Sequence, residues 1–175
     1  MRKSCIPNVF TFINLSCGII SILSVINEKY ALSGAFILLA GLVDRYDGRI
    51  ARFLNVSSDL GKELDSLADL VSFGVAPSIL VYILFNLDSF GPNGLLGYAV
   101  LLLFPICGAY RLARFNTTDF DGSFTGVPIT IVGCFMALIS LILLNLNITS
   151  PIYLIVLLMI IGSYLMVSKL KLKKF

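Results

Sequence analysis

Long apolar stretches, separated by short polar ones, run along the whole chain. Six of them are long enough to cross the roughly 30 Å of hydrocarbon in a bilayer. They cover residues 9–26, 32–54, 64–87, 95–112, 127–144 and 152–167. The polar connections carry turn-forming asparagine, glycine and proline residues. The pattern predicts an all-α fold, in which a single domain covering residues 1–175 crosses a membrane with six helices.

Composition agrees with lipid as the surrounding solvent. Hydrophobic residues make up 58% of the 175 positions, and charged residues only 13%. A soluble domain carries about 45–50% apolar and about 25% charged residues. Arg2 and Lys3 precede the first apolar stretch, and no small-residue cleavage site follows it. We therefore expect a membrane helix there rather than a cleaved signal peptide.

The basic residues predict the orientation in the membrane. With six crossings, all of the 13 lysines and arginines except Lys29 lie on the side of the two termini. Because basic residues favour the cytoplasmic side, we expect both termini in the cytoplasm and the protein in the cell (inner) membrane. The basic tail at residues 169–174 would either bind lipid headgroups or act as a plain stop-transfer anchor. No feature indicates a nucleic-acid partner.

The chain has no histidine, so any metal would be held by oxygen ligands. The four cysteines are widely spaced, lie in or beside apolar stretches and form no C-x-x-C pair. We expect free, buried thiols rather than disulfides or a zinc site. These cysteines are Cys5, Cys17, Cys107 and Cys134.

Acidic residues gather at the facing ends of the second and third apolar stretches. Asp44 and Asp47 are three residues apart, and Asp65 and Asp69 are four apart, so each pair shares one face of a helix. Carboxylates inside apolar helices are costly and usually mark a site. Four such charges would repel one another unless cations lay between them. Oxygen ligands of this kind suit Mg²⁺, Mn²⁺ or Ca²⁺.

Small residues accompany the acidic ones. Gly48, Ala51 and Gly61 lie beside the aspartates, where a larger side chain would block a ligand from reaching the metals. Arg52 lies within reach of a phosphate bound at such metals, so the set suggests a diphosphate ligand. The alternative for the small residues is helix packing, and for a single intramembrane aspartate it is pairing with an arginine.

The stretch DRYDGRIARFLNVSSDLGKELDSLAD, residues 44–69, reads D-x2-D-G-x2-A-R-x8-G-x3-D-x3-D. At every defined position it resembles the signature of the CDP-alcohol phosphotransferase family. Three further segments resemble the phosphatidylserine-synthase branch of that family. They are PNVFTFINLSCG at residues 7–18, YRLARFN at 110–116 and FTGVP at 124–128.

The resemblance implies a homodimer of six-helix subunits with a site that opens to the cytoplasm. It implies two divalent cations, Mg²⁺ or Mn²⁺ with Ca²⁺ able to substitute in binding, held by the four aspartates, and Asp69 as the general base. The donor would be CDP-diacylglycerol or CDP-archaeol, the acceptor L-serine, and CMP the leaving group. We expect the CDP-lipid to contact Pro7, Asn8, Thr11, Gly48, Ala51, Arg52, Ser58 and Gly61.

The acceptor site is expected near the cytoplasmic end of the fourth helix. Arg111, Arg114 and Asn116 lie there, and arginine pairs well with a carboxylate such as that of serine. The alternative is that these arginines are only positive-inside anchors. Other acceptors, glycerol 3-phosphate or inositol phosphate, would require more cations nearby. A cation transporter also uses intramembrane carboxylates, but the chain has no inverted repeat.

Overall fold

The computed structural model describes residues 5–54, 59–117, 124–146, 151–169 and 171–172. Within them the side chains of residues 5–7, 47–54, 59, 124–125 and 171–172 are not described. The helices are α1 (Cys5–Ile26), α2 (Tyr30–Leu54), α3 (Asp59–Asp69), α4 (Ala76–Leu84), α5 (Leu95–Thr117), α6 (Ile129–Asn145) and α7 (Ile152–Val167). A π-helical segment, η1 (Leu70–Val75), joins α3 to α4, and two 3₁₀ turns, η2 (Leu87–Ser89) and η3 (Pro92–Gly94), precede α5.

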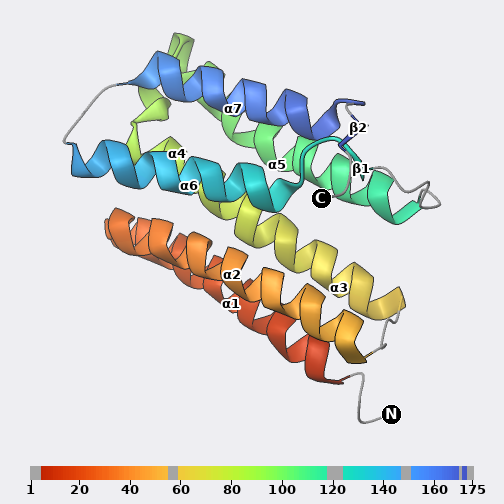
Figure 1. The fold of residues 1–175 in the computed structure, drawn as a ribbon. Helices are drawn as coiled ribbons and strands as arrows, with labels where there is room; N and C mark the ends of the chain where they lie inside the picture. Colours follow the sequence, from red (N-terminus) through yellow and green to blue (C-terminus); the bar gives the residue numbers. More distant parts are fainter. Residues whose placement is uncertain (1–4, 55–58, 118–123, 147–150, 170, 173–175) are drawn as a thin grey trace.

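The central helical rod α3–η1–α4 runs between two groups of helices (Figure 1). On one side α1 and α2 form an antiparallel pair, which turns at Glu28 with a left-handed φ of 59°. On the other side lie α5, α6 and α7. α2 packs against α6, and α5 packs against α7. The first turn of α1 and the last turn of α7 lie at the same end of the bundle, together with α3 (Figure 1).

A two-residue antiparallel strand pair lies at that same end. β1 (Phe124–Thr125) pairs with β2 (Lys171–Leu172), and Phe124 lies opposite Leu172 in the register. The pairing joins the segment before α6 to the segment after α7. The hydrophobic pattern did not predict it, because two-residue strands carry too few positions to show a period.

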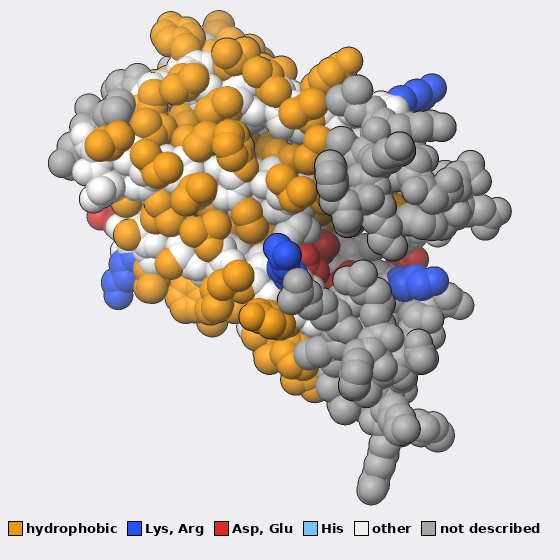
Figure 2. Space-filling model, viewed as in Figure 1, with side chains coloured by type: hydrophobic (Ala, Val, Ile, Leu, Met, Phe, Trp, Pro, Cys, Tyr) orange, Lys and Arg blue, Asp and Glu red, His pale blue; other side chains and the backbone are white. Residues whose placement is uncertain are grey.

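The surface is suited to lipid. Three helical stretches are long and apolar enough to cross a bilayer, namely Asn8–Ile26, Leu60–Leu84 and Pro92–Thr117. Two shorter apolar helices cover Ile129–Asn145 and Ile152–Val167. Apolar side chains cover much of the face shown in Figure 2, and acidic side chains lie in a recess beside them. The predicted all-α, multi-pass fold is therefore confirmed; crossing by the remaining helices stays a prediction.

The core is centred on the π-helical segment. Ser72, Phe73 and Gly74 of η1 are buried, and the amide of Ala76 donates to the carbonyl of Val71, five residues earlier. Pro77 follows, and its ring would clash with the Phe73 carbonyl in a regular α-helix. The wider π turn accommodates that proline in the middle of the rod. Proline in the middle of an apolar stretch is the sequence signal for this feature.

Two glycines let neighbouring helices approach this segment. A Cβ on Gly18 of α1 would lie 2.5 Å from the Ser72 hydroxyl oxygen and 2.9 Å from the Ser72 Cα. A Cβ on Gly133 of α6 would lie 2.4 Å from the Phe73 carbonyl oxygen. Both distances are too short for a side chain, so α1 and α6 contact η1 from two sides only because glycine stands at these positions.

The helix boundaries differ from the predicted ones mainly around the third helix. It was expected at 64–87, whereas the rod begins at Asp59 and its last α-helical residue is Leu84. Residues 55–58, in the connection between the second and third predicted helices, lie outside the described residues. The thiols of Cys17, Cys107 and Cys134 are free as predicted, but only Cys17 is buried and the other two are half-buried; the side chain of Cys5 is not described.

We expect Gly133→Ala to lower the free energy of unfolding by about 1–3 kcal/mol, the usual cost of overpacking a core. The added methyl group would meet main-chain atoms of Phe73, which cannot move without opening η1. Gly34→Ala is the matched control, because the three atoms nearest to its methyl group would all belong to the side chain of Leu141, which can move. Thermal unfolding in detergent measures both variants. Equal melting temperatures for the two would contradict this account of the α6 contact.

Candidate metal centre

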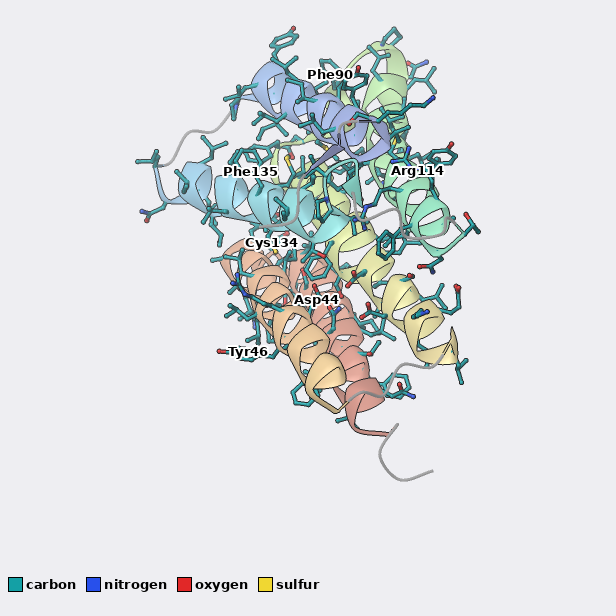
Figure 3. All side chains as sticks on the ribbon, turned by 45° about the vertical axis from the view of Figure 1, so that its right-hand side comes forward. Asp44, Tyr46, Phe90, Arg114, Cys134 and Phe135 are labelled. Carbon is teal, nitrogen blue, oxygen red and sulfur yellow. The ribbon has the colours of Figure 1, made fainter. Side chains whose placement is uncertain are left out.

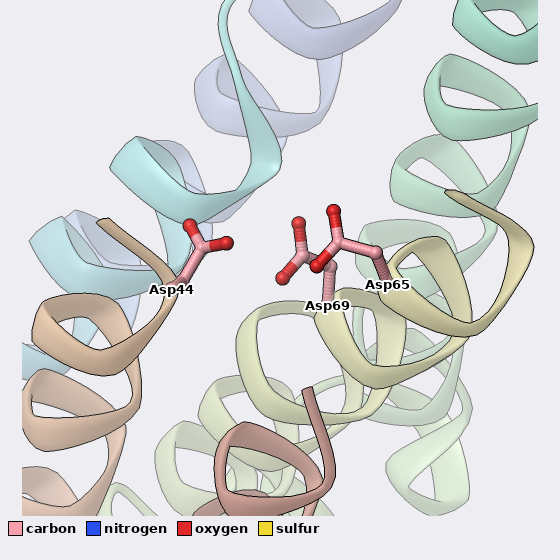
Figure 4. A group of neighbouring side chains, drawn as sticks. All are labelled: Asp44, Asp65 and Asp69. Carbon is pink, nitrogen blue, oxygen red and sulfur yellow. The ribbon is translucent and has the colours of Figure 1, made fainter. Parts of the chain in front are cut away.

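Three aspartates from two helices meet at one point in the bundle (Figure 4). Asp44 comes from α2, and Asp65 and Asp69 come from the last turns of α3. One carboxylate oxygen of each lies within 4.8 Å of the others. Asp69 is only 7% exposed, while Asp44 and Asp65 are half-buried. The cluster predicted from helical spacing is thus present for three of its four members.

Local helix geometry positions these side chains. Asp65 and Asp69 are one helical turn apart and therefore point in the same direction from α3. Asp44 points from α2 toward the middle of the bundle, whereas Tyr46 points away from it and is 57% exposed (Figure 3). The fourth predicted ligand, Asp47, lies in α2, but its side chain is not among those described.

Each of two aspartates in the cluster accepts a hydrogen bond from a neighbouring helix. Asn14 of α1 donates from Nδ2 to Oδ1 of Asp69 at 3.0 Å. Thr130 of α6 donates from Oγ1 to Oδ2 of Asp44 at 3.4 Å. Neither partner was predicted. Asn14 carried a usable signal, because it is a polar residue in an apolar stretch, three residues after the predicted contact Thr11.

The donor set fits divalent metal ions. Three carboxylates this close repel one another, and a cation among them would remove that repulsion. All three offer hard oxygen atoms, which Mg²⁺, Mn²⁺ and Ca²⁺ prefer. The residues present therefore form a candidate oxygen-only metal centre, as the sequence predicted.

The predicted CDP-lipid residues are described only in part. Thr11 is buried at 4% exposure, Asn8 lies half-buried one turn before it, and Gly61 lies half-buried one turn before Asp65. Four more lie in helices but their side chains are not described, and Ser58 lies outside the described residues. The four are Pro7, Gly48, Ala51 and Arg52.

The two arginines of α5 have different surroundings. Arg114 donates from Nη1 to the Val167 carbonyl at 2.9 Å and from Nη2 to the Ser168 carbonyl at 3.4 Å, so it caps the end of α7. Arg111 is 8% exposed, and its charge attracts that of Asp69. Its guanidinium carbon lies 5.5 Å from the centre of the Phe115 ring.

Arg111 also retains an unused donor. Its Nε is buried and has no hydrogen-bond partner in the described part of the chain. The third predicted acceptor residue, Asn116, donates to Glu63 at 3.2 Å and to Ser66 at 3.0 Å, so it joins the end of α5 to α3. Of the three residues, Arg111 is the one whose charge interacts with that of Asp69.

Comparison with known proteins agrees with this geometry. Residues 4–168 match the family described as CDP-alcohol phosphatidyltransferase. The chain is 38% identical over 177 residues to the CDP-diacylglycerol–serine O-phosphatidyltransferase of Bacillus subtilis, covering 97% of this chain and 90% of that protein. It is 40% identical over 126 residues to the Helicobacter pylori (strain J99) protein of the same name, covering 70% of this chain.

The same name belongs to a Saccharomyces cerevisiae relative, which is 40% identical over 127 residues. This chain spans about half the length of the H. pylori protein, 52%, and 43% of the yeast protein. The match to the family runs through all seven α-helices and includes the three clustered aspartates. The chain therefore belongs to the CDP-alcohol phosphatidyltransferase family.

Proposed function

We propose that this protein transfers the phosphatidyl group of CDP-diacylglycerol to L-serine and releases CMP. The observation that carries the proposal is the meeting of Asp44, Asp65 and Asp69 within 4.8 Å in a chain of this family. The names of the relatives support serine as the acceptor. CDP-archaeol, which differs in its lipid chains, is the alternative donor. Membership of a transferase family favours group transfer over the alternative of cation transport.

The four aspartates would hold two divalent cations, Mg²⁺ or Mn²⁺. Such cations, when bound, supply positive charge that neutralises the diphosphate and the departing CMP. Asn8, Thr11 and Gly61, with the other predicted contacts on α1 and α2, would bind the donor beside them. Gly61 leaves space there for close approach of the diphosphate.

Asp69 is placed to act as the general base. The serine hydroxyl oxygen attacks the lipid-side phosphorus and forms a new P–O bond, while the bond from phosphorus to the bridging oxygen breaks and CMP leaves with the electron pair. The hydroxyl proton passes to the Asp69 carboxylate. Burial of Asp69, at 7% exposure, keeps bulk water from competing for that proton. No side chain in the motif suits a covalent intermediate, so we favour direct displacement.

Arg111 is the better candidate for the serine carboxylate. It is buried near Asp69 and has an unused donor, whereas Arg114 is engaged with the end of α7. A carboxylate bound by Arg111 would bring the serine hydroxyl to the side of Asp69. The positive-inside distribution supports a site that opens to the cytoplasm from the inner membrane. A homodimer is proposed on the resemblance to the family alone.

The direct test is release of CMP from CDP-diacylglycerol in the presence of candidate alcohols. We expect release with L-serine and a divalent cation, and none with EDTA. Asp44→Asn removes one ligand charge and should lower the rate by more than the about tenfold to hundredfold that loss of a ligand's hydrogen-bond partner costs. Release with glycerol 3-phosphate or inositol phosphate but not serine would contradict the acceptor. Full activity of Asp44→Asn would contradict the metal centre.

The arginine assignment predicts different effects for two neighbouring variants. Arg111→Ala should raise the KM for serine about tenfold to hundredfold, because a charge-assisted hydrogen bond contributes about 1.5–3 kcal/mol. Arg114→Ala should leave that KM nearly unchanged and lower the melting temperature, because it uncaps α7. Serine titration at saturating CDP-lipid measures the first effect. Normal serine binding by Arg111→Ala would show that the carboxylate is held elsewhere.

A further inference from the structure

Helix α1 contributes one deeply buried polar side chain to the aspartate cluster. Asn14 is 1% exposed and makes two links to the central rod. Its Nδ2 donates to Oδ1 of Asp69 at 3.0 Å, and its main-chain carbonyl accepts from Oγ of Ser72 at 2.9 Å. One link therefore reaches the candidate base, and the other reaches the π-helical segment that follows it.

Packing fixes the main chain of Asn14. Gly18 lies one turn further along α1, and a Cβ there would be 2.9 Å from the Cα of Ser72. The two main chains are thus in direct contact at this point. This contact does not depend on the Ser72 hydroxyl, because it involves the main chain. Asn14 is consequently held at a set distance from Asp69.

The orientation of the Asn14 amide follows from the charge of its partner. An ionised carboxylate can only accept hydrogen bonds, so the NH₂ group must face Asp69. The amide oxygen Oδ1 is then buried with no partner in the described part of the chain. An unpaired buried carbonyl destabilises a protein, and here that cost accompanies the hydrogen bond to the buried Asp69 carboxylate. The hydrogen bond to Asp69, rather than the full hydrogen-bonding capacity of the amide, therefore decides the orientation of this side chain.

We propose that Asn14 is a positioning residue that fixes the orientation of the Asp69 carboxylate for cation binding and proton transfer. The terminal torsion of an aspartate is broad, so a carboxylate without such a partner samples many orientations. A hydrogen bond to Oδ1 removes this freedom and leaves Oδ2 available. Hydrogen-bond partners of metal-binding carboxylates orient their ligands in the same way. The inference rests on the proposed function, in which Asp69 binds metal and accepts the proton.

The test combines kinetics with cation binding that needs no substrate. In Asn14→Leu we expect kcat to fall about tenfold to hundredfold, with the KM for CDP-diacylglycerol within about twofold of the unmodified value. The Mn²⁺ concentration that gives half of the thermal stabilisation should rise about tenfold. The melting temperature without Mn²⁺ should fall, because Oδ1 of the buried Asp69 loses its donor, so the Mn²⁺ dependence and not the stability decides the role of Asn14. Asn14→Ala, which cannot clash, carries the same predictions for kcat and Mn²⁺ if the leucine variant does not fold.

Ser72→Ala is the matched control. It removes the hydrogen bond from Ser72 to the Asn14 carbonyl but keeps the one from the Asn14 amide to Asp69. It should therefore lower the melting temperature and leave both kcat and the Mn²⁺ concentration for half of the thermal stabilisation (the Mn²⁺ midpoint) unchanged. Equal kcat losses in both variants, or an unchanged Mn²⁺ midpoint in Asn14→Leu and Asn14→Ala, would overturn the proposal. If the unmodified protein binds Mn²⁺ but does not use serine, the proposed function is wrong. The role of Asn14 in cation binding is then decided by comparing the Mn²⁺ midpoints of the unmodified protein and the two Asn14 variants.

Discussion

Repulsion among three buried and half-buried carboxylates is the constraint on which the rest of this structure depends. Their oxygens lie within 4.8 Å of one another. Two unit charges about 4 Å apart interact by about 4 kcal/mol at an effective dielectric constant of about 20. That is a large part of a typical folding free energy of about 5–15 kcal/mol. Until cations bind, the packing of the surrounding helices must therefore hold the aspartates together against this repulsion.

The packing that opposes this repulsion is centred on the π-helical segment after Asp69. α1 contacts it through Gly18, and α6 contacts it through Gly133. The same two helices supply the hydrogen bonds to the cluster, from Asn14 to Asp69 and from Thr130 to Asp44. Close packing and carboxylate orientation are thus achieved by the same helices. The π-helical segment that both helices contact begins at Leu70, directly after Asp69.

Sequence reasoning predicted the helices and the aspartates because both depend on local spacing. Apolar length identified six helical segments, and intervals of three and four residues identified the shared faces. Asn14 and Thr130 were missed because their role depends on contacts between residues 55 and 86 positions apart. The sequence also does not distinguish Arg111 from Arg114, because both lie on the same face at the end of one predicted helix. Only the fold shows that one is buried where its charge interacts with that of Asp69 and the other caps α7.

The central claim is that Asp44, Asp65 and Asp69 form a divalent-cation site between α2 and α3. Anomalous X-ray scattering from crystals grown with Mn²⁺ tests it most directly, because it locates the ion without reference to activity. The account predicts anomalous density about 2.0–2.6 Å from carboxylate oxygens of all three residues, the range of such metal–oxygen bonds. Mn²⁺ bound only elsewhere on the protein, with none among these three carboxylates, would contradict it.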